Sequence, residues 1–358
     1  MALCIYCSSN IYQKSRQTRI LCKAAQNNLG LERNQRDESL AIEEYFDSHN
    51  LDEEFYDDIK WETQTYAIQD AQLKAQKIPN ITHHIWLTDP NNPVDIDSHP
   101  HNQEMIETTL ENMAHLKFQH LLWINIENGL EKTKKWAADK KLQVRYFKSI
   151  MTKKNQEVFQ VIDDYIAKGQ VIFAADLFRY LVVFEMGGVY LDVDQVVFEY
   201  DLILHKLDLV LYSQQYSGIQ SVETSFMASK PQNPLFKEVM KQIVKLNKDD
   251  NGQIFKSKCY QQSYYRIMYE TGPFRFSVAF NKVLKEGLID DQNYIILHYR
   301  IATQGSCPSY QQYFEQCMKE LKLVLIQGYP ILINVTMKHL SFGSWHNIKQ
   351  ELSLLRQS

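Results

Sequence analysis

The sequence predicts an α/β fold in which helices cover a parallel sheet, and two observations carry that prediction. From residue 78 onward, short apolar segments alternate with segments of helical periodicity in the order β-α-β-α-β, which is typical of parallel sheets. Residues 173–197 then read as a buried helix, a glycine turn and a buried strand that ends in two aspartates. Charge occurs in this stretch only where chemistry could use it.

The first part of the domain supplies three predicted strands. Residues 81–86 alternate in polarity and lead into the turn-rich segment 89–93, so they predict a strand followed by a loop. The following elements are helices over residues 102–117 and 130–140 and strands over 121–126 and 144–147. Ligands of such sheets bind beyond the carboxyl ends of the strands. We therefore expect Trp86, Asn125 and the two aspartates near one edge of the sheet.

The central helix, turn and strand follow from local composition. Residues 174–186 contain no glycine or proline and are mostly apolar, which predicts a buried helix, and the Gly-Gly pair at 187–188 predicts its end. Residues 189–191 suit a short interior strand. On an extended chain, Asp192 and Asp194 would face the same side. Two adjacent carboxylates repel each other, and a hard divalent cation would remove this conflict.

The second half of the domain continues the alternation of strands and helices. Predicted strands span residues 209–213, 225–230 and 295–299, and predicted helices span about 233–246, 260–270 and 278–285. A loop is expected over residues 249–252. The sequence contains no internal repeats and no low-complexity segment.

Composition and charge exclude several classes of protein. The chain of 358 residues has a net charge of −4, which gives no electrostatic case for nucleic acid as the main partner. The six cysteines are too sparse for a disulfide framework, so we expect reduced thiols. Cys4-x-x-Cys7 lacks the second pair that a zinc site would need. We recognise no transmembrane segment and no signal peptide.

Residues 1–76 differ in composition from the rest of the chain. They are rich in Gln, Asn, Glu and Asp, and they contain a single glycine and no proline. Segments 40–46 and 61–77 carry apolar residues at helical spacing, which predicts a helical extension. The extension would be either a structural cap or an element that recognises an acceptor or a membrane.

Two charged residues lie in the predicted central helix. Asp176 and Arg179 are three residues apart, so they share one helix face. A guanidinium in this apolar helix needs an anionic partner. Either a local ion pair between the two residues or a bound ligand would satisfy it.

The run A-D-L-F-R-Y…G-G-V-Y-L-D-V-D, over residues 175–194, resembles the DXD region of retaining GT-A glycosyltransferases. It is similar to family 32 glycosyltransferases, which include yeast Golgi mannosyltransferases, and to bacterial toxin and effector glucosyltransferases. Further similar stretches are IPNITHHIW at 78–86, SFMASKPQNPLF at 225–236, TGP at 271–273 and His…Gly-Ser-Trp at 339–345. Two positions depart from the family pattern, because Ala175 replaces a common Ser and segment 222–224 replaces a common Asn.

The resemblance covers roughly residues 78–346 and implies a GT-A fold, a Rossmann-like nucleotide-sugar-binding architecture, with a helical N-terminal extension. We accordingly expect three parts. These are an extension over residues 1–76, a GT-A glycosyltransferase domain over 77–347 and a tail over 348–358.

The resemblance also implies roles for the residues that bind the donor. Trp86 would stack on the uracil or guanine base, and Tyr190 would pack beside the ribose. Asp176 and Arg179 would hold hydroxyls of the donor sugar and would count among the catalytic residues. Asn125 joins the donor-binding set because of its place at the sheet edge. As an alternative, Trp86 would be an ordinary core residue.

The DXD aspartates would form the metal site of the implied enzyme. By the resemblance, Asp192 and Asp194 are catalytic residues that bind Mn²⁺ or Mg²⁺ and the ribose of the donor. Asp192 is accordingly also a donor-binding residue, and His339 could complete the metal shell. Ser344 and Trp345 would close over the diphosphate and stabilise the leaving group. No carboxylate nucleophile is evident in the sequence, so we expect transfer with retention. The alternative for His339 is an ordinary loop histidine.

The implied reaction is the transfer of a hexose to a protein or glycan acceptor. UDP-glucose and UDP-GlcNAc are the favoured donors, and GDP-mannose would make the protein a mannosyltransferase of glycan synthesis. We expect a soluble enzyme that is cytoplasmic or, as a bacterial effector, secreted into a host cell to act on host proteins.

Two functions of other classes stay open. The segment VYLDVDQVV also fits the D-x-D-x-V start of aspartyl-phosphate phosphatases, in which Asp192 would be the nucleophile. Such enzymes need a later lysine and a further acidic pair, for which Asp290-Asp291 is a poor candidate. The other alternative is a non-catalytic nucleotide-sugar-binding protein.

Overall fold

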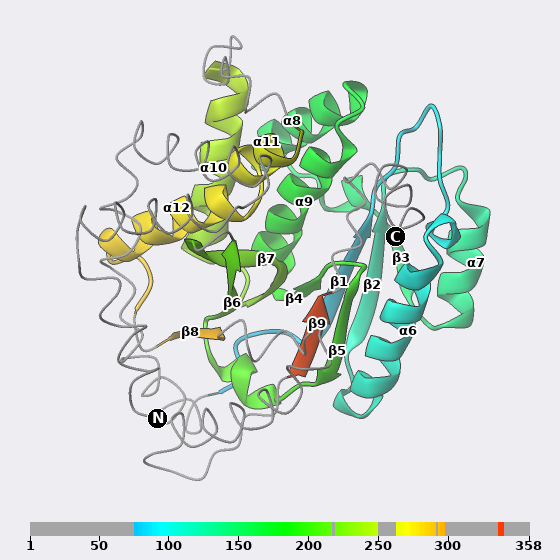
Figure 1. Ribbon diagram of the computed structural model, residues 1–358, viewed down its shortest axis with the longest axis horizontal. Coiled ribbons are helices and arrows are strands. Elements are labelled where there is room, and N and C mark those ends of the chain that lie inside the picture. The colour runs from blue at the N-terminus through cyan, green and yellow to red at the C-terminus, as the bar shows by residue number, and fades with distance from the viewer. Residues whose placement is uncertain (1–74, 217–218, 250–262, 291–292, 298–335, 340–358) are drawn as a thin grey trace, which may run out of the picture. The chain divides into compact units, whose positions relative to one another are not determined.

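The computed structural model describes residues 75–216, 219–249, 263–290, 293–297 and 336–339 (Figure 1). All of these residues belong to one compact unit, Glu53–Ser358. The predicted extension, apart from its last two residues, lies outside the described residues. So do the six cysteines, Ser344, Trp345 and the predicted tail.

A seven-stranded sheet forms the centre of the unit, with the strand order β3-β2-β1-β4-β7-β6-β8 (Figure 1). Its strands are β1 (Ile81–Trp86), β2 (Gln119–Ile124), β3 (Gln143–Tyr146), β4 (Gly188–Leu191), β6 (Leu209–Tyr216), β7 (Ile219–Ser229) and β8 (Tyr294–Leu297). Every strand predicted from the sequence is therefore present, with ends that differ by a few residues.

The prediction of a parallel sheet holds for strands β1 to β4 and for the pair β6 and β8, and it fails at β7. Strands β3, β2, β1 and β4 pair in parallel. Strand β7 pairs antiparallel with both β4 and β6. Only two residues separate the end of β6 from the start of β7. Such a short connection can join antiparallel strands only, because a parallel crossover needs a dozen or more residues.

Two further strands form a small separate sheet that the sequence did not predict. Strand β5 (Gln195–Glu199) pairs antiparallel with β9 (Thr336–His339). Because β5 follows β4 after three residues, the chain leaves the central sheet at the aspartate pair.

Helices cover both faces of the central sheet (Figure 1). They are α6 (Pro100–Met113), α7 (Glu131–Asp139), α8 (Gln156–Ala167), α9 (Val171–Met186), α10 (Pro234–Asp249), α11 (Ser263–Glu270) and α12 (Pro273–Lys285). Short 3-10 helices are η2 (Ile96–Ser98), η3 (Ala114–Leu116), η4 (Phe147–Ile150) and η5 (Leu202–Lys206). Of the seven α-helices in the described residues, only α8 was not predicted. Helices α8, α9, α10 and α12 pack on one face of the sheet, and α6 and α7 pack on the other.

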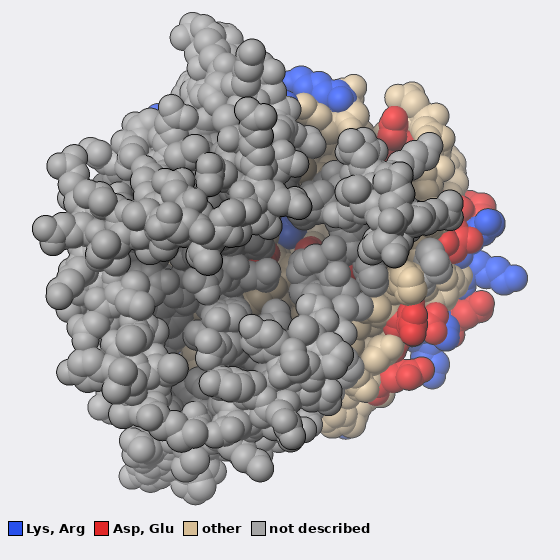
Figure 2. Space-filling view, viewed as in Figure 1, with Lys and Arg blue, Asp and Glu red and all other residues tan. Residues whose placement is uncertain are grey.

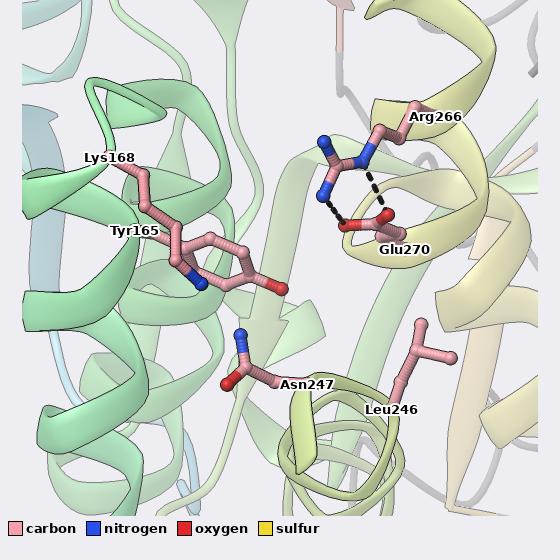
Figure 3. Close-up of a pocket in the computed structure, with 6 residues that line it drawn as sticks. All are labelled: Tyr165, Lys168, Leu246, Asn247, Arg266 and Glu270. Atoms are coloured by element: carbon pink, nitrogen blue, oxygen red, sulfur yellow. Dashed lines mark hydrogen bonds and ion pairs between the residues drawn. The ribbon is translucent and has the colours of Figure 1, made fainter. Parts of the chain in front are cut away.

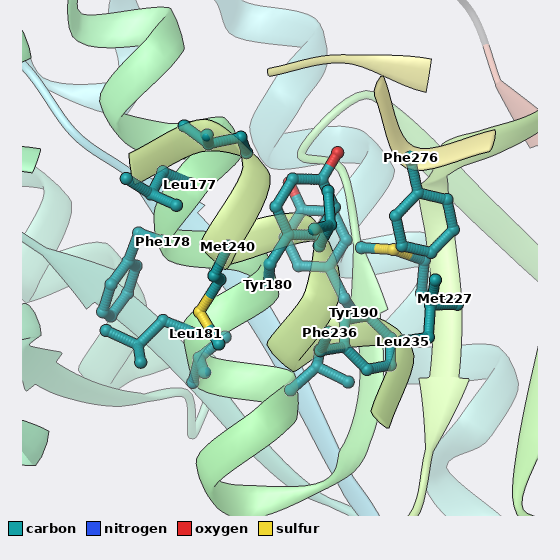
Figure 4. Packing of buried hydrophobic residues seen from close by; sticks show 14 of the residues in the cluster. Leu177, Phe178, Tyr180, Leu181, Tyr190, Met227, Leu235, Phe236, Met240 and Phe276 are labelled. Carbon is teal, nitrogen blue, oxygen red and sulfur yellow. The ribbon is translucent and has the colours of Figure 1, made fainter. Parts of the chain in front are cut away.

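Helix α9 forms the middle of the larger core (Figure 4). Tyr180 stacks on Phe276 of α12, with ring centroids 5.3 Å apart and planes 8° apart. Phe178 lies edge-on to Trp123 of β2 at 5.6 Å. Burying one such side chain contributes about 1.5–3 kcal/mol. The helix is therefore fixed on several sides, and charged residues within it are held in defined positions.

The surface near α6 and α7 carries interspersed charges of both signs (Figure 2). Lys140 pairs with Glu107 at 2.6 Å, and Lys132 pairs with Asp97 at 3.3 Å. In the part of the chain that the structure describes, no helix is both long enough and apolar enough to cross a membrane.

Candidate active site

Three neighbouring strands bring the predicted site residues to one edge of the sheet. Strands β2, β1 and β4 are adjacent and parallel. Trp86 is the last residue of β1, Asn125 directly follows β2, and Asp192 directly follows β4. The expectation that these residues share the carboxyl edge is confirmed.

The aspartate pair lies on a turn, so the prediction of an extended chain was wrong. Strand β4 ends at Leu191, and the Gln195 N–H donates to the Asp192 carbonyl at 3.0 Å, which closes the turn. The physical reason is that β5 must leave the central sheet to pair with β9. Asp192 and Asp194 are both partly exposed on this turn. Val193 packs against an apolar cluster.

Two donors fix the carboxylate of Asp192. The Tyr190 hydroxyl donates to its Oδ1 at 2.5 Å, and Nη1 of Arg179 lies 3.3 Å from the same oxygen. The Arg179 guanidinium also lies over the Tyr190 ring, 5.1 Å from its centroid. Burial raises the pKa of Tyr190 well above its ordinary value, so the phenol stays protonated and donates. The Asp192 side chain is 23% exposed and can therefore reach a ligand.

The charged residues of α9 form the ion pair that their spacing suggested. Arg179 Nη2 pairs with Asp176 Oδ1, and both side chains are buried. Burial disfavours the charge on Arg179, but Tyr190 and Asp192 outweigh this effect and raise its pKa above the ordinary value. Arg179 therefore stays cationic and links Asp176 to Asp192.

Two threonines complete this network, and sequence reasoning missed both. Arg179 Nη1 donates to the Thr224 carbonyl at 3.0 Å and lies 3.3 Å from its hydroxyl. The Thr271 hydroxyl donates to Asp176 Oδ2 at 2.6 Å. The Thr-Gly-Pro segment and the departure at 222–224 were the only signals, and neither indicated a contact with α9.

A buried carboxylate shapes strand β7 beside the site. Glu223 Oε1 accepts the N–H groups of Thr224 at 2.7 Å and Ser225 at 3.2 Å. The Ser225 carbonyl in turn accepts the N–H of Asp192 at 2.9 Å. Glu223 thereby fixes the backbone that faces Arg179 and Asp192.

Trp86 and Asn125 are held by backbone contacts at the sheet edge. The Trp86 indole N–H donates to the Val94 carbonyl at 2.8 Å, and its ring is only partly buried. Asn125 Oδ1 accepts the Thr88 N–H at 3.0 Å, and its Nδ2 donates to the Thr88 carbonyl at 2.7 Å. Asn125 therefore fixes the chain after β1. Contacts of Trp86 and Asn125 with a donor stay predictions.

Asp192 and Asp194 are described with their side chains, whereas only the backbone of His339 is described. The backbone of His339 pairs with Gln195, next to Asp194 in sequence. Among the residues that the structure describes, no group of three His, Cys, Asp or Glu side chains could hold a metal ion. Two carboxylates on one partly exposed turn still offer hard oxygen ligands that suit Mg²⁺ or Mn²⁺. A bound nucleotide sugar would have to supply the remaining oxygen ligands of the ion.

Residues 37–206 match the family model described as a glycosyltransferase sugar-binding region containing a DXD motif. This match includes the turn with Asp192 and Asp194, and it begins within the predicted extension. The protein is a glycosyltransferase. No curated protein matches the chain.

Several solved structures are similar to this glycosyltransferase. The PaToxG glycosyltransferase is 16% identical, the similarity covers 75% of this chain and 85% of that one, and the TM-score is 0.43. The ligand-free glycosyltransferase domain of the YGT toxin is 10% identical, with 60% and 80% covered and a TM-score of 0.41. Its UDP-bound form is 11% identical, with the same coverage and a TM-score of 0.40.

The fold of the enzyme belongs to the predicted α/β class. Its central sheet is mixed, helices lie on both faces, and the DXD turn follows the strand between β1 and β7. The network around Arg179 then provides a cation, the phenol of Tyr190, two carboxylates and two threonine hydroxyls.

Proposed function

We propose that the protein is a metal-dependent, retaining hexosyltransferase that moves glucose or GlcNAc from a UDP-sugar to a protein or glycan acceptor. One observation carries the proposal. The Asp192 carboxylate, partly exposed at the DXD turn, is oriented by Arg179 and Tyr190. The acceptor would be a host protein where the enzyme acts as a bacterial effector.

The proposed metal site uses the two aspartates of the turn. Asp192 and Asp194 would hold Mn²⁺ or Mg²⁺ together with oxygens of the donor, and His339 would complete the shell. When bound, such an ion would offset negative charge on the diphosphate as the glycosidic bond to it breaks. Arg179 would help to hold Asp192 in this orientation, because Nη1 of its guanidinium lies 3.3 Å from Oδ1.

The remaining residues would bind and orient the donor. Arg179 and Asp176 would position the sugar ring, since oriented reactants have less entropy to lose in the transition state. Trp86 would stack on the base and Tyr190 would lie near the ribose. Ser344 and Trp345 would donate hydrogen bonds to the diphosphate.

The decisive test replaces Asp192 and Asp194 together by asparagine. Release of UDP from UDP-glucose or UDP-GlcNAc is measured with Mn²⁺, without acceptor, for this variant and the wild type. We expect a loss of at least about 100-fold, because uncharged amides hold a divalent cation poorly. The matched control, Asp163→Asn with Asp164→Asn on α8, also removes two carboxylates and should keep full activity.

Equal turnover in the Asp192/Asp194 variant and the wild type would contradict the proposal. A parallel thermal-shift comparison of UDP-glucose, UDP-GlcNAc and GDP-mannose identifies the donor, because the bound nucleotide sugar stabilises the folded protein. A shift with GDP-mannose alone would favour a mannosyltransferase. Release of phosphate from an aryl phosphate would instead favour the phosphatase alternative.

A further inference from the structure

We propose that Thr271 is a positioning residue of the transfer reaction, which holds the Asp176 carboxylate in the orientation needed for the donor sugar. This inference rests on the proposed function, because it assigns Thr271 a role through Asp176. It concerns the loop between α11 and α12, which is far from α9 in sequence.

The contact between Thr271 and Asp176 is direct and fully enclosed. The Thr271 hydroxyl donates to Asp176 Oδ2 at 2.6 Å, while Asp176 Oδ1 pairs with Arg179. Thr271 is 0% exposed and Asp176 is 2% exposed. Each carboxylate oxygen therefore has its own protein donor, and water has little access to replace either one. Each oxygen keeps a second lone pair with which it can accept a sugar hydroxyl.

The backbone of Thr271 is itself held by α9. Its carbonyl accepts the hydroxyl of Tyr180 at 2.7 Å, and its N–H donates to the Ile267 carbonyl at 3.1 Å. The next residue, Gly272, leaves no space for a side chain, because an added Cβ would lie 2.9 Å from the Ile267 carbonyl oxygen. The hydroxyl therefore projects from a rigid turn.

The last turn of α11 is also fixed from its outer side (Figure 3). Arg266 Nε pairs with Glu270 at 2.5 Å, and the Arg266 guanidinium lies 5.2 Å from the ring centroid of Phe173 on α9. These two side chains line a small pocket together with Tyr165, Lys168, Leu246 and Asn247. Glu270 directly precedes Thr271, so this ion pair helps to set the position of the hydroxyl.

Loss of the Thr271 hydroxyl would free one oxygen of a buried carboxylate. The Asp176 side chain could then rotate. Arg179, which also contacts Asp192 and Thr224, would no longer have Asp176 as a partner in a fixed position. The effect would fall on the orientation of the reacting sugar, so we expect a change mainly in kcat.

The test compares Thr271→Val with Thr271→Ser in donor hydrolysis. Valine keeps the shape and removes the hydroxyl, and we expect kcat to fall about 10- to 100-fold with KM changed less than about threefold. Serine keeps the hydroxyl and should restore kcat to within about threefold of the wild type. Thr82→Val is the matched control, because it removes another fully buried hydroxyl. Thr82 lies on β1, and its hydroxyl bonds to His120 at 2.7 Å. It should leave kcat unchanged.

A second pair of variants tests the same hydroxyl in case the valine variant does not fold. Thr271→Ala and Thr271→Ser both lack the γ-methyl group and differ only in the hydroxyl, so a kcat ratio of about 10 or more between them supports the proposal. A double variant with Asp176→Asn should lose little more than Asp176→Asn alone, since Thr271 would act through that carboxylate.

The outcomes separate this inference from the proposed function. If Asp176→Asn abolishes turnover and folded Thr271→Val keeps wild-type kcat, the role of Thr271 is overturned and the transferase site stands. If serine and alanine are equally impaired, the hydroxyl is irrelevant and the inference fails. If wild type neither binds nor hydrolyses any of the three nucleotide sugars, both proposals fail.

Discussion

A single oxygen of Asp192 receives the two donors that orient the DXD turn. Tyr190 and Arg179 approach Oδ1 from strand β4 and helix α9, so the carboxylate is fixed by two different elements. The Arg179 guanidinium also makes a cation–π contact with the Tyr190 ring. A carboxylate constrained in this way loses little freedom when it binds a cation, which favours binding.

Replacing Tyr190 by phenylalanine tests this orientation. The variant keeps the ring beneath Arg179 and removes only the hydroxyl that donates to Asp192. We expect kcat/KM for donor hydrolysis to fall about 10- to 100-fold, because a hydrogen bond to a charged group contributes about 1.5–3 kcal/mol. Steady-state kinetics with Mn²⁺ and the donor identified by thermal shift measures this change.

Tyr200→Phe is the control for Tyr190→Phe. The Tyr200 hydroxyl is also buried and bonds to His205 Nε2 at 2.9 Å, on a different face of the sheet. Its removal should lower the free energy of unfolding by about 1 kcal/mol and leave kcat/KM unchanged. Equal loss of activity in both variants would mean that Tyr190 acts through general stability.

Sequence spacing identifies only those site residues whose partners are close along the chain. Asp176 and Arg179 are three residues apart, so helical periodicity places them on one face. Thr224 lies 45 residues from Arg179, and Thr271 lies 95 residues from Asp176. Periodicity carries no information at such separations, because the packing of whole helices and strands decides the contact.

The junction of α9 and β4 depends on two glycines with left-handed backbone conformations. Gly187 has φ +66° and Gly188 has φ +94°. A Cβ on Gly188 would lie 2.6 Å from the Ile81 carbonyl oxygen of the neighbouring strand β1. The chain can therefore reverse from helix to strand within two residues only if position 188 has no side chain.

Substitution of Gly188 by alanine should destabilise the protein strongly. Both the left-handed conformation and the clash with β1 contribute, so we expect the free energy of unfolding to fall by about 3 kcal/mol. Urea unfolding followed by circular dichroism measures the change. Donor hydrolysis should be lost together with stability, because Asp192 directly follows strand β4.

Gly169→Ala separates the two contributions. Gly169 also has a left-handed φ, +70°, but no atom lies within 4 Å of an added Cβ. Only the backbone strain remains there, so we expect a loss of about 1 kcal/mol. If both alanine variants lose the same stability, close packing of β4 on β1 contributes nothing at position 188.

Elements with strong local signals were predictable, and elements defined by distant partners were not. Helix α9 has a long apolar run and a glycine end, so its prediction is confirmed within three residues at its start. Strand β5 forms because β9, more than a hundred residues later in the chain, pairs with it. No local pattern indicates such a partner, and the DXD segment was therefore expected to stay extended.

Across the whole sheet, buried histidines are neutral structural groups. His83 Nε2 bonds to the Gly187 carbonyl at 2.7 Å and its Nδ1 accepts from Trp123, and burial lowers its pKa to about 4. His205 bonds to Ile78 and Tyr200, and burial lowers its pKa to about 4. Their side chains link strands and loops on both faces of the sheet.

These histidines predict loss of stability in mild acid. Their folded pKa values lie below the ordinary value of 6.5, so the unfolded chain binds more protons between about pH 6.5 and 4. The contribution of these histidines to the free energy of unfolding is therefore fully present above pH 6.5, and it is lost as the pH decreases towards 4. Each group contributes at most about 1.4 kcal/mol per pH unit. Thermal unfolding from pH 8 to 4.5 should show Tm falling below about pH 6.5.

His84 allows the effect of one histidine to be isolated. It is fully buried, and burial lowers its pKa to about 3. In His84→Leu no group at this position can take up a proton in the unfolded chain, so Tm should depend less steeply on pH below 6.5. At pH 8 the variant should be at least as stable as wild type, since leucine needs no hydrogen bond. Parallel pH curves for the two proteins would contradict the assignment of acid sensitivity to this neutral, buried ring.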